Sequence, residues 1–227
     1  MTYFNKPKHI IAGENLAKGL IKRDELDVKF FKANEYFDEL FEFFDCEVID
    51  FPMNSKISGL TQKDELGLSV MINSNIPNGM INFTYAHELA HVILHIKNGI
   101  TPEIDTDNST SFTSRDKLEI EANQFAAQFL LPDISLKSQV LSNFTLYNIK
   151  YNSNVSVDVI KWRLISILTK EYGLHKIDSM KVFDSYRQCR THETVKNSEM
   201  FSVLQEMKLN QMDKKFERDL YGYATWI

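Results

Sequence analysis

The stretch FTYAHELAHVILH, residues 83–95, carries three histidines at intervals of four residues. Four residues make slightly more than one helical turn, so His87, His91 and His95 are predicted to share one face of a helix over residues 80–96. His87 and His91 belong to the pattern HExxH, in which two imidazoles about 6 Å apart along the axis can converge on one ion. The stretch therefore predicts a metal site on a helix.

Glu88 points to hydrolytic chemistry. It follows the first histidine, so its carboxylate lies beside the ligand face and can reach a water molecule at the ion. A purely structural zinc site has no need of a glutamate at this position, whereas a hydrolytic site uses it to take a proton from water. Glu88 is thus the predicted catalytic residue, and His87 and His91 are predicted ligands of Zn²⁺.

A catalytic zinc ion takes three protein ligands and keeps a fourth position open. His95 lies about 12 Å along the helix axis from His87, too far for both to bind one ion. We expect His95 outside the ligand set, as an outer partner of the site, on the surface or at the lip of a cleft. The candidates for the third ligand are His95, Glu119, Glu121, His175 and His192.

Periodicity separates two of these candidates. Residues 115–131, RDKLEIEANQFAAQFLL, are predicted to form a helix that ends before Pro132. On it, Glu119 shares a face with small residues suited to close helix contact, whereas Glu121 shares a more polar face. We therefore take Glu119 as the third ligand and keep Glu121 as the alternative. Asn123, one turn beyond Glu119, either bonds the outer nitrogen of a ligating histidine or is satisfied by backbone.

These two segments resemble the ImmA/IrrE family of zinc metallopeptidases. The family hallmark is HExxH followed by E-x-E-A-N-x-F-A and a leucine-rich stop at proline, here NFTYAHELAHVILH and EIEANQFAAQFLLP. The resemblance is specific over residues 66–132 and looser to about residue 170. Ala90 stands where the family commonly has glycine, which leaves the motif helix intact because alanine favours helices.

The resemblance implies an α+β, mainly helical, gluzincin-like metallopeptidase fold with a small sheet packed on the HExxH helix. It also implies a zinc-dependent endopeptidase that makes a regulated, site-specific cut in a protein partner. Such partners are helix-turn-helix repressors or antitoxins, often encoded by mobile elements. The family's ligands fall on His87, His91 and Glu119, and its general base falls on Glu88.

Composition narrows the setting. The 227 residues are 43% hydrophobic and 25% charged, typical of a globular protein, and the net charge of −5 makes nucleic acid an unlikely main partner. Cys46 and Cys189 stand far apart, so no disulfide is expected and a reducing cytoplasm is the natural location. We find no signal peptide and no run long enough to span a membrane.

Patterns elsewhere predict the surrounding elements. Aromatic residues spaced along residues 24–45 predict one amphipathic helix, with Phe30, Phe37, Phe41 and Phe44 on its apolar face. Alternation over residues 66–73 predicts a half-buried strand, which could align an extended substrate if it lies at the sheet edge.

We expect a metallopeptidase domain over residues 1–135 with its motif core at 66–132. A small helix-turn-helix-like segment over 136–170 and a C-terminal helical extension of unknown role over 171–227 should follow. Ser156 is a predicted N-cap, and Lys161 and Arg163 should lie on a solvated face or contact phosphate. The polar stretch over residues 97–114 is either a substrate rim or a connector.

Two other functions remain open. The chain could be a metal-stabilised regulatory protein that binds its partner without cutting it, or a DNA-binding regulator that works through residues 143–170. A Glu88→Gln variant tests the first, because it should keep metal and partner binding while losing proteolysis. Salt-dependent binding of duplex DNA tests the second.

Overall fold

The computed structural model describes residues 6–100, 114–206 and 208. It has a mainly helical α+β fold with one three-stranded sheet. None of the helices in the described ranges is long and apolar enough to cross a membrane. The α-helices are α1 (Lys8–Arg23), α2 (Phe37–Phe43), α3 (Asn78–Ala90), α4 (Ser114–Leu130), α5 (Asp133–Leu141), α6 (Leu146–Ser153), α7 (Val157–Lys170), α8 (Lys176–Arg187) and α9 (His192–Lys196).

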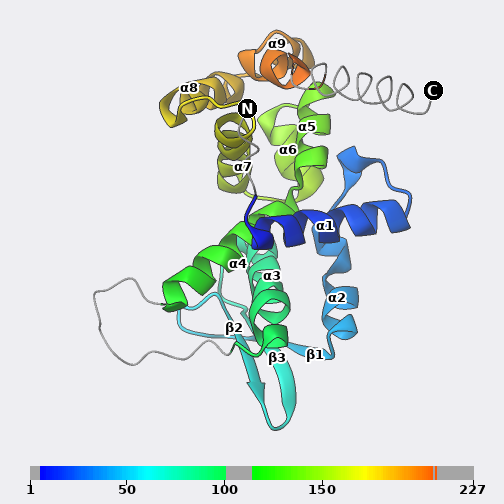
Figure 1. Cartoon of the computed structure of the whole chain (residues 1–227), viewed down its shortest axis with the longest axis vertical. Coiled ribbons are helices and arrows are strands. Elements are labelled where there is room, and N and C mark those ends of the chain that lie inside the picture. Colours follow the sequence, from blue (N-terminus) through cyan, green and yellow to red (C-terminus); the bar gives the residue numbers. More distant parts are fainter. Residues whose placement is uncertain (1–5, 101–113, 207, 209–227) are drawn as a thin grey trace, which may run out of the picture.

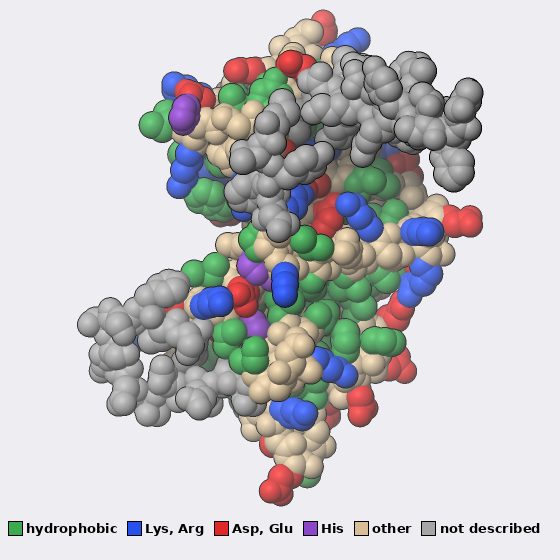
Figure 2. Space-filling model, in the orientation of Figure 1, with side chains coloured by type: hydrophobic (Ala, Val, Ile, Leu, Met, Phe, Trp, Pro, Cys, Tyr) green, Lys and Arg blue, Asp and Glu red, His purple; other side chains and the backbone are tan. Residues whose placement is uncertain are grey.

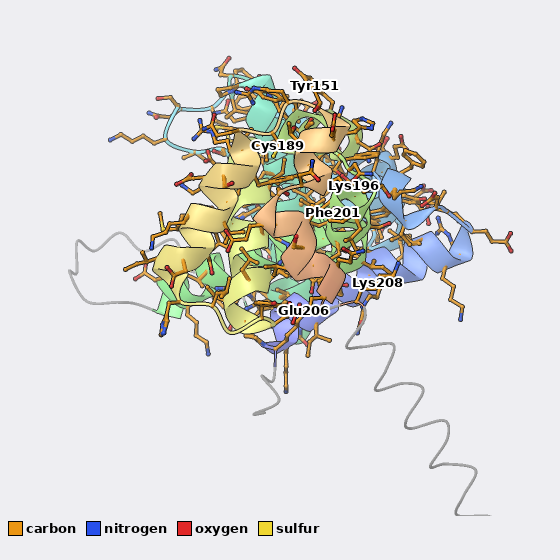
Figure 3. The ribbon with its side chains drawn as sticks, turned by 90° about the horizontal axis from the view of Figure 1, so that it is seen from above. Tyr151, Cys189, Lys196, Phe201, Glu206 and Lys208 are labelled. Atoms are coloured by element: carbon orange, nitrogen blue, oxygen red, sulfur yellow. The ribbon has the colours of Figure 1, made fainter. Side chains whose placement is uncertain are left out.

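The elements are arranged in two parts with α1 and α4 between them. In Figure 1 the sheet, α2 and α3 occupy the lower part of the view, and α5 to α9 occupy the upper part. Residues 199–206 are also helical. Seen from above, Lys196, Phe201 and Glu206 mark the last described helices, which cover the upper end of the molecule (Figure 3). The rest of the polar stretch at 101–113 and the chain beyond residue 208 lie outside the described residues.

The sheet has the strand predicted over residues 66–73 at its centre. Its strands are β1 (Cys46–Phe51), β2 (Gly59–Asp64) and β3 (Gly67–Asn73), in the order β1-β3-β2. β3 is the predicted strand, and its Val70 and Ile72 are buried as the alternation requires. Because β3 pairs parallel with β1 and antiparallel with β2, it is the central strand, so the condition under which it could align a substrate at a sheet edge is not met. The free edge beside α3 belongs to β2.

The helix predicted over residues 24–45 is also wrong. The segment forms short 3₁₀ turns at Val28–Phe30 and Ala33–Tyr36 before α2 begins at Phe37. The Asp27 side chain accepts a hydrogen bond from Lys29 N, at 3.0 Å, and competes with the helix, and Phe31 is extended and buried. Phe37 and Phe41 are therefore buried, as the predicted apolar face requires, whereas Phe30 is 54% exposed.

Helix α1 has no counterpart among the predicted elements, although Ile10, Ala17 and Leu20 are buried at helical spacing. It packs closely against α4, and Gly13 is the point of nearest approach. A Cβ atom there would lie 2.7 Å from the carbonyl oxygen of Phe125, so only glycine allows this contact. The close packing brings the N-terminal residues of α1 to the helix that carries Glu119.

Helices α6 and α7 form the predicted pair. Asn154 ends α6 in a left-handed conformation with φ of 51°, and Ser156 caps α7 by accepting a hydrogen bond from Val159 N at 3.2 Å. Arg163 on α7 neither faces solvent nor is placed to contact phosphate, so that expectation is wrong. Its side chain is buried, bonds the Leu131 carbonyl oxygen at 3.0 Å and forms an ion pair with Asp133.

Asp133 therefore links α5 to α7, to α1 and to the residues before α1. It is buried at the first position of α5, where Arg163 and Lys6 contact its carboxylate and Glu14 accepts a hydrogen bond from its backbone nitrogen at 2.9 Å. Burial alone would raise the pKa of Asp133, but the charge of Arg163 and the Lys6 contact outweigh it and hold that pKa well below its usual range. The ionised form is thus the stable partner of Arg163.

Replacing Asp133 with asparagine should lower the free energy of unfolding by about 3–5 kcal/mol, because it leaves the Arg163 charge buried and unpaired. Because the folded-state pKa of Asp133 is depressed, its contribution is present above about pH 4 and is lost as pH falls below that. Urea unfolding at pH 7 measures the loss. Asp178→Asn, which breaks an exposed and solvent-screened pair with Lys181, is the control and should leave the urea midpoint nearly unchanged. Equal losses in both variants would contradict a structural role for Asp133.

Candidate metal centre

The motif residues lie on α3 and the turn that continues it. Helix α3 ends at Ala90, and residues His91–His95 form a π-helical turn, a feature often found at functional sites. The small or apolar side chains of Ala86, Leu89 and Ala90 are fully buried against the rest of the core. This packing fixes the helix and leaves its polar residues directed at α4 and β2.

His87, His91 and Glu119 come together between α3 and α4. The distance between His87 Nε2 and His91 Nε2 is 3.0 Å, and Glu119 oxygens lie 3.2 Å from His87 Nε2 and 3.6 Å from His91 Nε2. Within the described ranges these three residues form the one group of this kind that could hold a metal ion. Histidine side chains beside an acidic one reach the surface of the face shown in Figure 2, below the upper helices.

The electrostatics of the group suit a cation. Hydrogen bonds from His87 and His91 hold the pKa of Glu119 far below its usual range. Burial alone would lower the pKa of His87, but its hydrogen bond to Glu119 and the nearby charges of Glu88 and Glu119 raise it instead. The two imidazoles and the carboxylate thus bring nitrogen and oxygen donors of the kind that bind a cation to one point between α3 and α4.

Glu121 does not point to this group. It lies on the adjoining face of α4, where its carboxylate is 3.5 Å from His95 Nε2 and 3.9 Å from Lys117 Nζ. His175 and His192 are exposed at the start of α8 and α9, among the upper helices. Of the candidates for a third ligand, Glu119 is the one that lies against Nε2 of both His87 and His91, whereas His95 contacts His91 through the other ring nitrogen.

Glu88 is buried beside the group. Thr61 on β2 donates a hydrogen bond to Glu88 Oε2 at 2.6 Å, which leaves Oε1 without this constraint. Burial raises the pKa of Glu88, and the positive charge of His87 and the bond from Thr61 oppose that shift. Gly59 makes room for the carboxyl, because a Cβ atom there would lie 2.5 Å from Glu88 Oε1. No sequence pattern marked Thr61 or Gly59, whose roles depend on how β2 crosses α3.

Each histidine of the group has a partner for its outer nitrogen. Asn123 Oδ1 lies 3.1 Å from His87 Nδ1, and His95 Nδ1 lies 3.0 Å from His91 Nδ1. Tyr85, on the opposite side of α3, stacks on Phe37 with ring centroids 5.3 Å apart. Tyr85 therefore faces the core and not the site.

The group opens into a cleft of about 630 Å³. One wall is formed by residues 56–63, which include most of the edge strand β2, and the opposite wall includes Phe83, Glu119 and Asn123. Met80, Phe83 and Asn123 also line a second cavity, of about 590 Å³, that continues toward Trp162. The arrangement can accommodate an extended polypeptide beside the candidate metal ligands.

A comparison with known protein families shows the family to which this chain belongs. Residues 41–164, more than half of the chain, match the IrrE N-terminal-like domain, which is a peptidase family, and this span contains Glu88 and all three residues of the metal group. The chain belongs to the ImmA/IrrE family. The ImmA/IrrE match begins within α2 and ends within α7, so α1, α8 and α9 lie outside it.

A curated relative supports the ImmA/IrrE assignment. The immunity region protein 2 of Bacillus phage phi105 is 31% identical over 155 residues, which are 67% of this chain and 92% of the relative. Among solved structures, a Mycobacterium tuberculosis transcriptional regulator matches with a TM-score of 0.48 and 16% identity over 70% of this chain. The match spans only 47% of that regulator, and a likeness this low carries no argument about function.

Proposed function

We propose that this protein is a zinc-dependent endopeptidase that makes a site-specific cut in a protein partner. The observation that carries the proposal is the placement of a buried glutamate, Glu88, beside His87, His91 and Glu119 in a cleft open to solvent. A site that served only to hold a metal would be closed and would have no use for Glu88.

The donor set fits zinc. Two imidazole nitrogens and one carboxylate are a common ligand set of catalytic zinc, and bonds of about 2.0–2.2 Å in a tetrahedron separate ligand atoms by about 3.3–3.6 Å. The three separations of 3.0, 3.2 and 3.6 Å are close to this range. His87, His91 and Glu119 would hold the ion. Asn123 and His95 contact Nδ1 of His87 and of His91, respectively, which leaves Nε2 of each histidine as the ligand atom.

Glu88 would perform the proton transfers. When bound, zinc would supply a Lewis acid that polarises the scissile carbonyl and makes water more acidic. Thr61 holds Glu88 Oε2, so Oε1 is the atom free to take a proton from the attacking water and to deliver it to the leaving amine. The raised pKa of Glu88 suits this exchange, because a carboxyl that must both accept and donate a proton works best when its pKa is nearer neutrality.

Replacing Gly59 with alanine should disrupt this arrangement. The added Cβ would lie 2.5 Å from Glu88 Oε1 and 2.8 Å from Glu88 Cγ, so the carboxyl must move. We expect more than about a tenfold loss of hydrolysis with zinc content unchanged, and a stability cost of about 1–3 kcal/mol. Gly19→Ala is the matched control, because no atom of the described residues lies within 4 Å of the added Cβ, and it should keep full activity. Full activity of Gly59→Ala would contradict the role given to Glu88.

The substrate would bind along β2. Its outer edge carries backbone groups with no partner strand within the described residues, and β2 lines the cleft that contains the metal group. An extended peptide can add to such an edge through main-chain hydrogen bonds. The adjoining cavity, with Phe83, Met80 and Trp162 in its lining, would accept apolar side chains of the same peptide.

We propose a helix-turn-helix repressor or an antitoxin as the partner. The peptidase family and the immunity-region relative support a regulatory protein as the substrate. New protein N-termini, mapped across all proteins of cells that carry the gene, test this proposal and identify the substrate in the same experiment. A new terminus within a small DNA-binding regulator, present with the wild-type protein and absent with Glu88→Gln, is expected. Identical termini in the two strains would contradict the proposal.

A further inference from the structure

His95 is buried directly behind the metal group. It is 1% exposed, and its Nδ1 lies 3.0 Å from Nδ1 of His91, the nitrogen that faces away from His87 and Glu119. The two rings are 4.9 Å apart between centroids. The π-helical turn over His91–His95 places both rings on one side of the chain. His95 thus touches His91 without reaching the position where the ion would bind.

The contact between the two nitrogens fixes where the protons lie. A neutral imidazole has one N–H and one free lone pair. If His91 Nε2 gives its lone pair to a metal ion, then its proton is on Nδ1 and is donated to His95 Nδ1. His95 must then carry its own proton on Nε2. The direction of each hydrogen bond follows from the one before it.

The surroundings of His95 Nε2 match this assignment. Among the residues that the structure describes, that buried atom has no hydrogen-bond partner, which is unusual for a native polar group. The carboxylate oxygen Oε2 of Glu121 lies 3.5 Å from it. Glu121 in turn lies 4.0 Å from His9 Nδ1 on α1, at the far end of the chain of contacts. If His95 Nε2 carries a proton, the N–H group is directed at the Glu121 carboxylate. This explains why a polar nitrogen is buried here and why Glu121 lies beside it.

We propose that His95 is a positioning residue, which accepts the His91 Nδ1 proton and thereby holds the His91 ring with Nε2 free for the metal, with Glu121 as the acceptor for His95. This inference rests on the proposed function only in requiring that His91 binds a metal. Asn123 does the same for His87, so the two ligands are held by different chemistry, one by an amide oxygen and one by a second imidazole.

A packing role for His95 makes the opposite prediction for a pair of variants. His95→Phe keeps the size of the ring and removes the acceptor. His95→Asn keeps an acceptor atom at the position of Nδ1 and loses volume in a buried place. If His95 acts through its hydrogen bond, His95→Asn should bind zinc more tightly than His95→Phe does. If His95 acts only by packing, His95→Phe should bind zinc more tightly than His95→Asn does.

Zinc affinity, measured by competition with a chelator on the purified full chain, separates the two. We expect a loss of about 10–100-fold in His95→Phe and a clearly smaller loss in His95→Asn. The exposed His175→Phe is the control and should bind zinc as the wild type does. Thermal unfolding without metal checks that each variant folds. Equal or tighter zinc binding in His95→Phe than in His95→Asn would overturn the inference, whereas no zinc binding by the wild type would overturn the proposed metal site itself.

Nitrogen-15 NMR of the zinc-loaded wild type reads the protons directly. The expected spectrum has the His91 ring proton on Nδ1 and the His95 ring proton on Nε2. The variants His91→Ala and His95→Phe identify the two signals. A His95 proton found on Nδ1 would overturn the inference even if both variants lost zinc.

Discussion

Glu88→Gln should abolish peptide-bond hydrolysis and leave zinc and partner binding intact. Glutamine has the size of glutamate, and its amide oxygen can still accept the hydrogen bond from Thr61 Oγ1, which is 2.6 Å long in the wild type. The amide cannot take a proton from water, so the general-base contribution, about 10²–10⁴-fold in rate, is lost. Zinc content and the rate of cleavage of the identified partner measure the two effects separately.

The same variant separates the proposed function from its rival. A regulatory protein that binds its partner without cutting it would keep full biological activity in Glu88→Gln. Thr61→Val is a useful companion, because it removes the bond that holds Glu88 and leaves the carboxylate in place. We expect Thr61→Val to have an intermediate rate. Wild-type activity in Glu88→Gln cells would show that proteolysis is not the function.

Glu119→Ala should lower zinc affinity by more than about a hundredfold, because it removes a proposed ligand. This loss should exceed the loss caused by removing a residue that contacts a ligand but not the ion. Glu121→Ala is its matched control on the same helix. It should lower zinc affinity less than about tenfold, because Glu121 contacts His95 and not His87 or His91. Isothermal titration with zinc compares the two variants with the wild type.

The opposite order would contradict the ligand assignment. A larger loss in Glu121→Ala than in Glu119→Ala would mean that α4 presents its other carboxylate to the ion. Unchanged affinity in both would mean that the third ligand comes from elsewhere. In either case the close approach of Glu119 to His87 and His91 would be a property of the metal-free protein alone.

The local periodicity of the chain predicted which side chains of the two helices would lie close together. Helix spacing separates His95 from His87 and favours Glu119 over Glu121, and the structure brings Glu119 to the two histidines. Side chains from outside these two helices were not predictable. Thr61 and Gly59 reach Glu88 only because β2 crosses α3, and that crossing depends on long-range packing.

The sheet shows the same limit. Alternating residues predicted the strand that became β3 and its buried face. They carry no information on strand order, which depends on the hairpin with β2 and the parallel pairing with β1. Helix α1 is a different case, because its buried residues do show helical spacing, so a periodic pattern in the sequence could have predicted it.

The structure also weakens the DNA-binding alternative. That alternative needs basic side chains on α7 free for phosphate. Arg163 is instead buried in an ion pair with Asp133, and Lys161 lies over the ring of Trp162 at 5.6 Å. The net charge of the chain is −5, so the charge of the rest of the chain would not add to the attraction between this segment and DNA.

The most direct test of the central claim is cleavage of the partner by the purified protein. The partner is the regulator in which the new N-terminus appears, and the reaction is run with zinc, with a chelator, and with zinc restored after chelation. A single cut at the bond mapped in cells, lost with chelator and recovered with zinc, is the predicted result. A cut that survives chelation, or that Glu88→Gln makes equally well, would contradict the claim.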